Sequence, residues 1–137
     1  MKTEYYIAYG SNLNLEQMAW RCPTASVVGA AMLEGYRLVF STFATIEPQE
    51  GARVPVGLWR IDESCEEQLD IYEGYPGLYR KEYVDVSVNG QTFHAMVYIM
   101  NGGRPNQPSA GYINTVTRGY EDFGLDKSYL TAALRAV

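Results

Sequence analysis

The chain has 137 residues, of which 47% are apolar and 13% aromatic, and its formal net charge is -5. This length is typical of one domain, here residues 1–137, which buries about two-thirds of the surface of its unfolded chain and needs no disulfide to hold its core. The acidic balance lacks the cationic excess that binds a phosphate backbone, so we expect no nucleic-acid partner.

The few cysteines and histidines and the short apolar runs exclude further classes of protein. Cys22 and Cys65 are the only cysteines that could pair, and with one histidine they cannot supply a four-ligand Cys-His zinc site, so we expect no metal. No apolar run approaches the ~20 residues of a membrane span or follows a basic start, so we expect neither a membrane span nor a signal peptide. We therefore expect a protein of the reducing cytoplasm with no membrane partner.

The first half of the chain reads as a strand, a tight loop, a helix and further strands. Residues 4–9 are aromatic and β-branched and predict a strand. Gly10 interrupts it, and a helical pattern over residues 14–21 ends before Pro23. Strand-like runs bounded by Gly or Pro then predict a meandering sheet over residues 36–41, 43–46 and 54–61.

The second half begins with a helix whose N-terminal cap is Asp62 and whose end is Gly74. Asn89-Gly90 predicts a hairpin between strands over residues 79–88 and 91–100, because both central residues of a type I′ turn need positive φ. Helical patterns follow over residues 109–122 and 126–136, with Ser109 and Asp126 as caps and Gly124 as the break between them. The elements predict an α/β fold of the α+β kind: a small mixed β-barrel with short flanking helices.

The loop Gly10-Ser11-Asn12 is a candidate anion site. Backbone amides in such a loop can point outward, and a helix that starts near Asn14 would add about 0.3 to 1 kcal/mol of interaction with an anion. The alternative is that Gly10 makes the turn and Ser11 or Asn12 only caps the helix. The short pattern does not decide between these interpretations.

Glu73 is a candidate general base. It lies in the last turn of its predicted helix, where a carboxylate costs about 0.3 to 1 kcal/mol, and the neighbouring tyrosines Tyr72, Tyr75 and Tyr79 would partly desolvate it. Both influences raise the pKa of a carboxyl group toward neutrality. The alternative is a surface ion pair between Glu73 and Arg80 or Lys81.

Two segments of the chain are informative together. Residues 6–13 read Y-I-A-Y-G-S-N-L and residues 69–79 read L-D-I-Y-E-G-Y-P-G-L-Y. This pair resembles the two signatures of the γ-glutamylcyclotransferase-like family, and the resemblance extends through residues 96–100 and 108–112. It implies a β-barrel-based α/β fold with one cavity, in which Glu73 is the acid-base residue. The substrate-binding residues that we expect on this basis are Tyr6, Ile7, Ala8, Tyr9, Gly10, Ser11, Asn12, Tyr79, Tyr98 and Tyr112.

The residues suit the reaction that the resemblance implies. A γ-glutamyl amide carries its own nucleophile, the α-amine, which attacks the γ-carbonyl to give 5-oxoproline, so the protein must hold the folded-back chain and move protons. We expect no cofactor. The family acts on γ-glutamyl amino acids, amines and larger intermediates, and the amine that leaves here stays open, as does the choice between a monomer and a homodimer.

Two other functions compete with this interpretation. A cysteine-dependent hydrolase would use Cys22 or Cys65 with His94, but burial or simple exposure explains each of these residues. A non-catalytic module would use the same cavity to bind an amino-acid-like molecule or a protein partner. Replacing Glu73 with Gln separates the second alternative from an enzyme.

Overall fold

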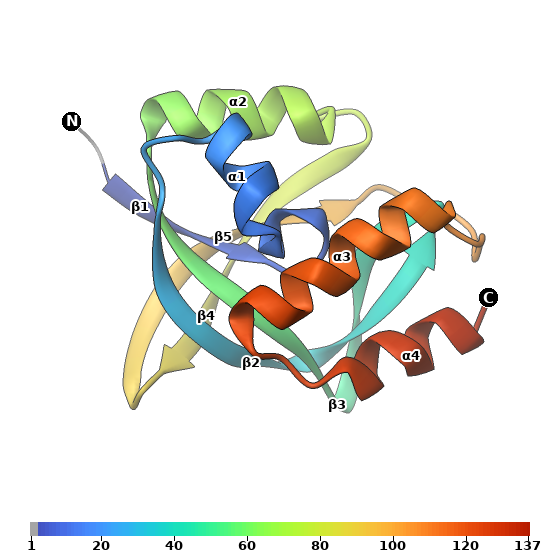
Figure 1. Ribbon diagram of the computed structural model, residues 1–137. Coiled ribbons are helices and arrows are strands. Elements are labelled where there is room, and N and C mark those ends of the chain that lie inside the picture. Colours follow the sequence, from blue (N-terminus) through green and yellow to red (C-terminus); the bar gives the residue numbers. More distant parts are fainter. Residues whose placement is uncertain (1–2) are drawn as a thin grey trace.

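The computed structural model describes residues 3–137 and shows a mixed α+β fold, as predicted. Its elements in chain order are β1 (Thr3–Ala8), the 3-10 turn η1 (Ser11–Leu13), α1 (Leu15–Arg21), β2 (Ser26–Ser41), β3 (Phe43–Asp62), α2 (Glu63–Glu73), β4 (Tyr79–Val88), β5 (Gln91–Met100), α3 (Ala110–Phe123) and α4 (Lys127–Arg135). Helix α3 crosses the front of the sheet, α1 and α2 lie over its upper end, and α4 lies beside its lower edge (Figure 1). The hydrophobic core lies between these helices and the sheet.

The sheet is curved but not closed, so the term barrel fits it only loosely. The strand order is β2-β3-β1-β5-β4, with β1 and β5 parallel and the other neighbours antiparallel. Within the described residues, the edge strands β2 and β4 do not pair with each other. They meet through side chains instead, because Val88 Cγ1 lies 2.8 Å from the place where a Cβ on Gly29 would be. The missing ladder bonds leave the predicted barrel open.

The strands β2 and β3 are longer than the sequence predicts. They span 16 and 20 residues and join at Thr42, whose φ is 67°. Register shifts lie between Val27 and Gly29 and between Glu34 and Tyr36. Such irregularities place Gly inside a continuous strand, where the sequence pattern takes Gly as an end.

The local signals for helix ends and for the hairpin are confirmed. Asp62 Oδ1 accepts from the backbone N–H of Cys65 at 2.9 Å, and Gly74 ends α2 with φ of 63°. Asn89 and Gly90 have φ of 51° and 81° in the turn between β4 and β5. Ser109 and Asp126 cap α3 and α4, and Gly124 ends α3.

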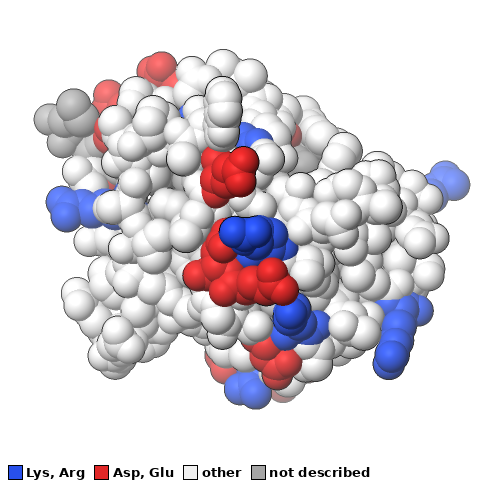
Figure 2. Space-filling model, viewed as in Figure 1, with Lys and Arg blue, Asp and Glu red and all other residues white. Residues whose placement is uncertain are grey.

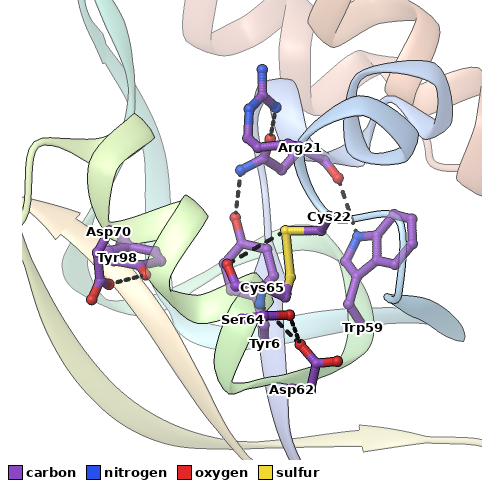
Figure 3. Close-up of a disulfide and its surroundings, with 10 residues drawn as sticks. Tyr6, Arg21, Cys22, Trp59, Asp62, Ser64, Cys65, Asp70 and Tyr98 are labelled. Atoms are coloured by element: carbon purple, nitrogen blue, oxygen red, sulfur yellow. Dashed lines mark hydrogen bonds between the residues drawn. A yellow bond between two sulfur atoms is a disulfide. The ribbon is translucent and has the colours of Figure 1, made fainter.

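Cys22 and Cys65 form a disulfide that the sequence did not require. It joins the end of α1 to the first turn of α2, with 4.9 Å between the two Cα atoms (Figure 3). Both side chains are buried, and their adjacency depends on how the two helices pack. Because disulfides persist mainly in oxidising compartments, the pairing removes support from the argument for a reducing cytoplasm.

The charges on the face that carries α3 are of both signs. Acidic and basic side chains alternate down the middle of this face (Figure 2). Arg118 pairs with Asp122 at 3.2 Å, and Lys127 pairs with Glu121 at 2.9 Å. These pairs neutralise one another, so the net negative charge does not produce a strongly acidic patch at this place.

Candidate active site

A small pocket brings together residues that are far apart in the sequence. Its volume, with the open mouth included, is about 290 Å³. It is lined by Tyr6, Ile7, Tyr9, Gly10, Ser11, Asn12, Ala44, Glu73, Tyr79, Tyr98 and Tyr112. The loop after β1, the end of α2, both strands of the hairpin and the first turn of α3 therefore meet at one cavity.

Two residues distinguish this lining from the residues expected to bind substrate. Ala8 pairs with Gly57 of β3 and is buried in the core, outside the pocket lining. Ala44 lines the pocket, but nothing in the sequence pointed to it. It reaches the site because the turn at Thr42 brings the start of β3 beside Gly10.

The loop after β1 contains a 3-10 turn, and its residues Gly10, Ser11 and Asn12 line the pocket. Its N-cap is Gly10, which has no side chain to occupy the first amides of the turn. A Cβ on Gly10 would lie 3.1 Å from Ala44 Cβ and 3.2 Å from the Tyr112 hydroxyl oxygen, so a side chain would crowd the pocket. The first amides of a 3-10 turn have no acceptor within the turn, which leaves the N–H groups of Ser11 and Asn12 available to a ligand.

Helix α1 begins at Leu15, close to the start near Asn14 that the sequence predicts. Its cap is Asn14, whose Oδ1 accepts from the backbone N–H of Gln17 at 3.0 Å. Neither Ser11 nor Asn12 caps this helix, so that alternative is wrong. The 3-10 turn also separates the start of the seven-residue α1 from Gly10, so the expected contribution of its dipole is not supported.

Helix α3 holds the loop in place. A Cβ on Gly119 would lie 2.6 Å from Leu13 Cβ and 2.7 Å from the backbone nitrogen of Asn14. The absence of a side chain lets the helix backbone approach the loop closely. Asn14 Nδ2 also donates to the Thr115 carbonyl oxygen at 3.1 Å, which ties the loop to the same helix.

Asn12 is fixed by three partners. Its Nδ2 donates to the Tyr6 hydroxyl oxygen at 2.9 Å, and its Oδ1 accepts from Arg21 Nη1. Its backbone carbonyl accepts from Trp59 Nε1 at 3.1 Å. Figure 3 shows Tyr6, Arg21 and Trp59 gathered beside the disulfide. Arg21 escaped sequence reasoning because a basic residue in the last turn is ordinary for a helix.

Three pocket tyrosines have hydroxyl protons that are committed to the protein. Tyr9 donates to the Tyr98 carbonyl at 2.6 Å, and Tyr79 donates to the Ala44 carbonyl at 2.6 Å. The Tyr98 hydroxyl donates to Asp70 Oδ1 at 2.5 Å. These tyrosines shape the cavity and hold its walls together.

The other two tyrosines accept hydrogen bonds and retain their own protons. The Tyr6 hydroxyl accepts from Asn12, and the Tyr112 hydroxyl accepts from the Ala44 backbone N–H at 3.0 Å. Burial raises the pKa of both hydroxyls above the usual range, so each stays protonated at neutral pH. Tyr6 and Tyr112 therefore can donate to a ligand.

Glu73 is half-buried at the end of α2. Burial raises the pKa of its carboxyl group to about 7, while the positive charge of Arg21 acts in the opposite direction. Within residues 3–137, no hydrogen bond to another side chain offsets the desolvation of this carboxylate. A carboxyl group in this state can exchange a proton near neutral pH.

The alternative in which Glu73 forms a surface ion pair is wrong. Arg80 pairs with Glu82 at 2.7 Å, and Lys81 pairs with Glu66 at 2.6 Å. These two cations, both on strand β4, therefore have other carboxylate partners. Glu73 instead faces the tyrosine-lined pocket.

The cysteine-dependent hydrolase finds no site in the described part of the chain. Cys22 and Cys65 are joined to each other, and His94 is an exposed residue of β5 that pairs with Asp85 at 2.8 Å. None of these side chains lines the pocket.

Two further properties concern the described residues as a whole. Between residues 3 and 137, none of the helices combines the length and apolar character needed to cross a membrane. The same residues contain no group of three or more His, Cys, Asp or Glu side chains placed to hold a metal ion.

The chain is similar to known proteins over nearly its whole length. A family model described as gamma-glutamyl cyclotransferase, AIG2-like, matches residues 6–117. Mouse gamma-glutamylcyclotransferase is 30% identical over 142 residues, which cover 93% of this chain and 76% of the mouse protein. The human gamma-glutamylcyclotransferase is 29% identical over 138 residues, covering 90% of this chain and 73% of the human protein.

Solved structures agree with these matches. One described as a gamma-glutamyl cyclotransferase superposes with a TM-score of 0.88 at 28% identity and covers 99% of this chain and 88% of that one. A human protein described as uncharacterized protein loc79017 superposes with a TM-score of 0.85 at 28% identity, covering 100% of this chain and 89% of that one. The family match contains every residue of the pocket. The chain therefore belongs to the gamma-glutamyl cyclotransferase, AIG2-like family and is an enzyme of that family.

Proposed function

We propose that the enzyme converts a γ-glutamyl amide to 5-oxoproline and a free amine, with Glu73 as general acid and base. A bond forms between the α-nitrogen of the substrate and its γ-carbonyl carbon, and the bond from that carbon to the leaving amine breaks. The α-ammonium group loses two protons in total. One passes through Glu73 to the leaving nitrogen, and the released amine takes up the equivalent of the other near neutral pH.

The loop after β1 is the proposed site of the α-carboxylate. The backbone N–H groups of Ser11 and Asn12 have no acceptor in the 3-10 turn, and the hydroxyl of Tyr112 lies beside Gly10. These groups are donors, and a carboxylate is an acceptor. Holding the α-carboxylate here would keep the substrate folded back on itself, which lowers the barrier to ring closure.

Tyr6 is the proposed donor to the oxyanion that develops on the γ-carbonyl oxygen. Asn12 donates to its hydroxyl oxygen, so the hydroxyl proton is free for the substrate. The negative charge of Glu73 contributes to the raised pKa of Tyr6, which indicates that the two groups lie within electrostatic range of each other. A prearranged donor near the reacting carbonyl stabilises the transition state.

The observation that carries the proposal is the state of Glu73. Its half-buried carboxyl group has a pKa raised to about 7, and it shares one small pocket with the Gly10 loop and two proton-retaining tyrosines. A titratable group perturbed by desolvation in a pocket is the expected property of an acid-base catalyst. Tyr6, Ile7, Tyr9, Gly10, Ser11, Asn12, Tyr79, Tyr98 and Tyr112 remain the proposed substrate-binding residues, and Ala8 supports them from the core.

The test is the formation of 5-oxoproline by the purified chain and by the Glu73→Gln variant. The substrates are a γ-glutamyl amino acid, γ-glutamyl-ε-lysine, a γ-glutamyl amine and glutathione, and the product is quantified by mass spectrometry. We expect Glu73→Gln to lower kcat/KM by about 10³-fold, because the amide cannot exchange the proton. The kcat/KM of the unmodified chain should fall as the pH decreases below about 7, where Glu73 becomes protonated.

Glu67→Gln is the matched control. Glu67 lies on the same helix and is exposed, and it does not line the pocket. This variant should retain the full rate. Full activity of Glu73→Gln would overturn the acid-base role, and binding of the amides without 5-oxoproline from any of them would favour the non-catalytic module.

We also propose that the enzyme is monomeric or homodimeric, needs no cofactor and has its small substrate as partner. Its cytoplasmic location stays a prediction, which the Cys22–Cys65 disulfide does not support. The net charge of -5 supports the absence of a nucleic-acid partner. Fractionation of cells that express the chain tests the location.

A further inference from the structure

Three exposed aromatic side chains each contact a residue that lines the pocket. Phe43 is 44% exposed, Tyr72 is 43% exposed and Tyr75 is 40% exposed. They come from the start of β3, the last turn of α2 and the segment after α2. We call these three residues the aromatic rim.

Two members of the aromatic rim contact tyrosines of the pocket wall. The ring of Phe43 packs edge-on against Tyr112, with 5.3 Å between centroids. The ring of Tyr75 packs edge-on against Tyr98, with 6.5 Å between centroids. Each exposed ring therefore continues the wall of the cavity outward.

The third member, Tyr72, contacts the loop after β1. Its hydroxyl lies 2.8 Å from Ser11 Oγ, within hydrogen-bond distance. The guanidinium of Arg21 covers its ring at 3.5 Å from the centroid. The hydroxyl bond and the stacked cation hold Tyr72 in one position beside the mouth.

Lys81, the cation on the Tyr75 side of the aromatic rim, is already neutralised. Lys81 Nζ lies 4.2 Å from the centroid of the Tyr75 ring. It is 2.6 Å from Glu66 and 2.9 Å from Asp70, so two carboxylates surround one ammonium group. A further carboxylate arriving at this side of the mouth would meet an excess of negative charge.

We propose that the aromatic rim binds the leaving group of the substrate and selects γ-glutamyl amides of amines that carry an aromatic or long aliphatic group and no carboxylate. The inference rests on the proposed function. The pocket is small and polar around Glu73, and it suits the glutamyl part. The amine then extends beyond this lining, toward Phe43 and Tyr75, which contact the wall tyrosines Tyr112 and Tyr98. Aromatic surfaces at this place remove apolar groups from water.

The test compares three synthetic amides: γ-glutamyl-phenethylamide, γ-glutamyl-methylamide and γ-glutamyl-phenylalanine. We expect kcat/KM for the phenethylamide to exceed that for the methylamide by about tenfold or more, chiefly through a lower KM. We expect the phenylalanine compound, which adds only a carboxylate, to be about tenfold poorer than the phenethylamide. Phe43→Ala and Tyr75→Ala should each reduce the ratio of phenethylamide to methylamide to about 3 or less.

Tyr83→Ala is the control for these variants. Tyr83 is an exposed aromatic residue of β4 that stacks on His94, and it does not line the pocket. Its replacement should leave the ratio unchanged. General damage to the fold would lower the rates of both amides together, so the ratio reports the aromatic rim alone.

The outcomes separate this inference from the proposed function. Equal kcat/KM for the phenethylamide and the methylamide, or a ratio that survives both rim substitutions, overturns the selectivity. In that case 5-oxoproline formation that depends on Glu73 still supports the cyclotransferase reaction. An absence of 5-oxoproline from all three amides contradicts the proposed function and the rim inference with it.

Discussion

The tyrosine-lined pocket and a larger groove elsewhere on the molecule differ in size and in the state of their charged groups. The groove lies between α4, the strands β2 and β3 and the segment 102–105, and its volume is about 1070 Å³ with the open side included. Arg37 and Arg53 lie along it, but Arg37 pairs with Glu47, and Arg53 Nε donates to the Tyr129 hydroxyl at 2.8 Å. The small pocket instead contains Glu73, a half-buried carboxyl group with no such partner among the described residues.

The comparison shows that volume alone does not locate the chemistry in this fold. The larger hollow is lined mainly by apolar residues, and the exposed Arg37 and Arg53 along it have partners, which gives little free energy and no reactivity. The smaller hollow keeps a carboxyl group away from water and leaves two hydroxyl protons free. These unfavourable features are retained where a reaction needs them.

The largest expected effect is on stability and follows from the raised pKa of Glu73. A carboxyl group whose pKa is raised in the folded state favours folding fully below the pKa of the unfolded chain, near 4.5, and this contribution is lost as the pH rises through about 7. Glu73→Gln, which stays neutral, should be more stable than the unmodified chain at pH 8 by up to about 3 kcal/mol. At pH 4 the two should be equally stable. Urea unfolding at both pH values measures the difference, and a pH-independent difference would contradict the burial of this charge.

The next effect concerns the free hydroxyl proton of Tyr6. We expect Tyr6→Phe to lower kcat by about 10²-fold, as the loss of one donor to a developing oxyanion does, with a smaller change in KM. Tyr120→Phe is the matched control, because the buried Tyr120 hydroxyl has no hydrogen-bond partner among residues 3–137. The control should retain its rate and its Tm. Equal losses in the two variants would mean that Tyr6 acts only through packing.

The smallest effect is expected in the groove. Arg53→Ala should change kcat/KM less than twofold, because Arg53 is exposed and its hydrogen bond to Tyr129 lies away from Glu73. Steady-state rates of 5-oxoproline formation test this expectation. A loss of tenfold or more would transfer part of the function to the groove and remove the contrast between the two hollows.

The features that sequence reasoning located are those that local chemistry decides. Asn89-Gly90 needs positive φ at both positions, and Asp62 needs only the amides of the next turn, so each can be identified from a few residues. Glu73 was identified in the same way, since an acidic residue before Gly74 is unfavourable at a helix end. Its burial then follows from aromatic neighbours that are close in sequence.

The features that sequence reasoning missed depend on distant segments. Arg21 reaches the site through Asn12 and Tyr72, and Ala44 does so through the turn at Thr42. The open edge between β2 and β4 likewise depends on how two remote strands approach. No local pattern carries this information, because it arises from packing between elements.

Helix α3 performs two tasks at the same site. Gly119 seats the helix against the loop, and Tyr112, two turns earlier on the same side of the helix, reaches Ala44 and Gly10. A displacement of α3 would therefore move the loop amides and the Tyr112 hydroxyl together and keep the distance between them. The groups proposed to bind the substrate carboxylate thus belong to one rigid unit, and Glu73, at the end of another helix, lines the same pocket.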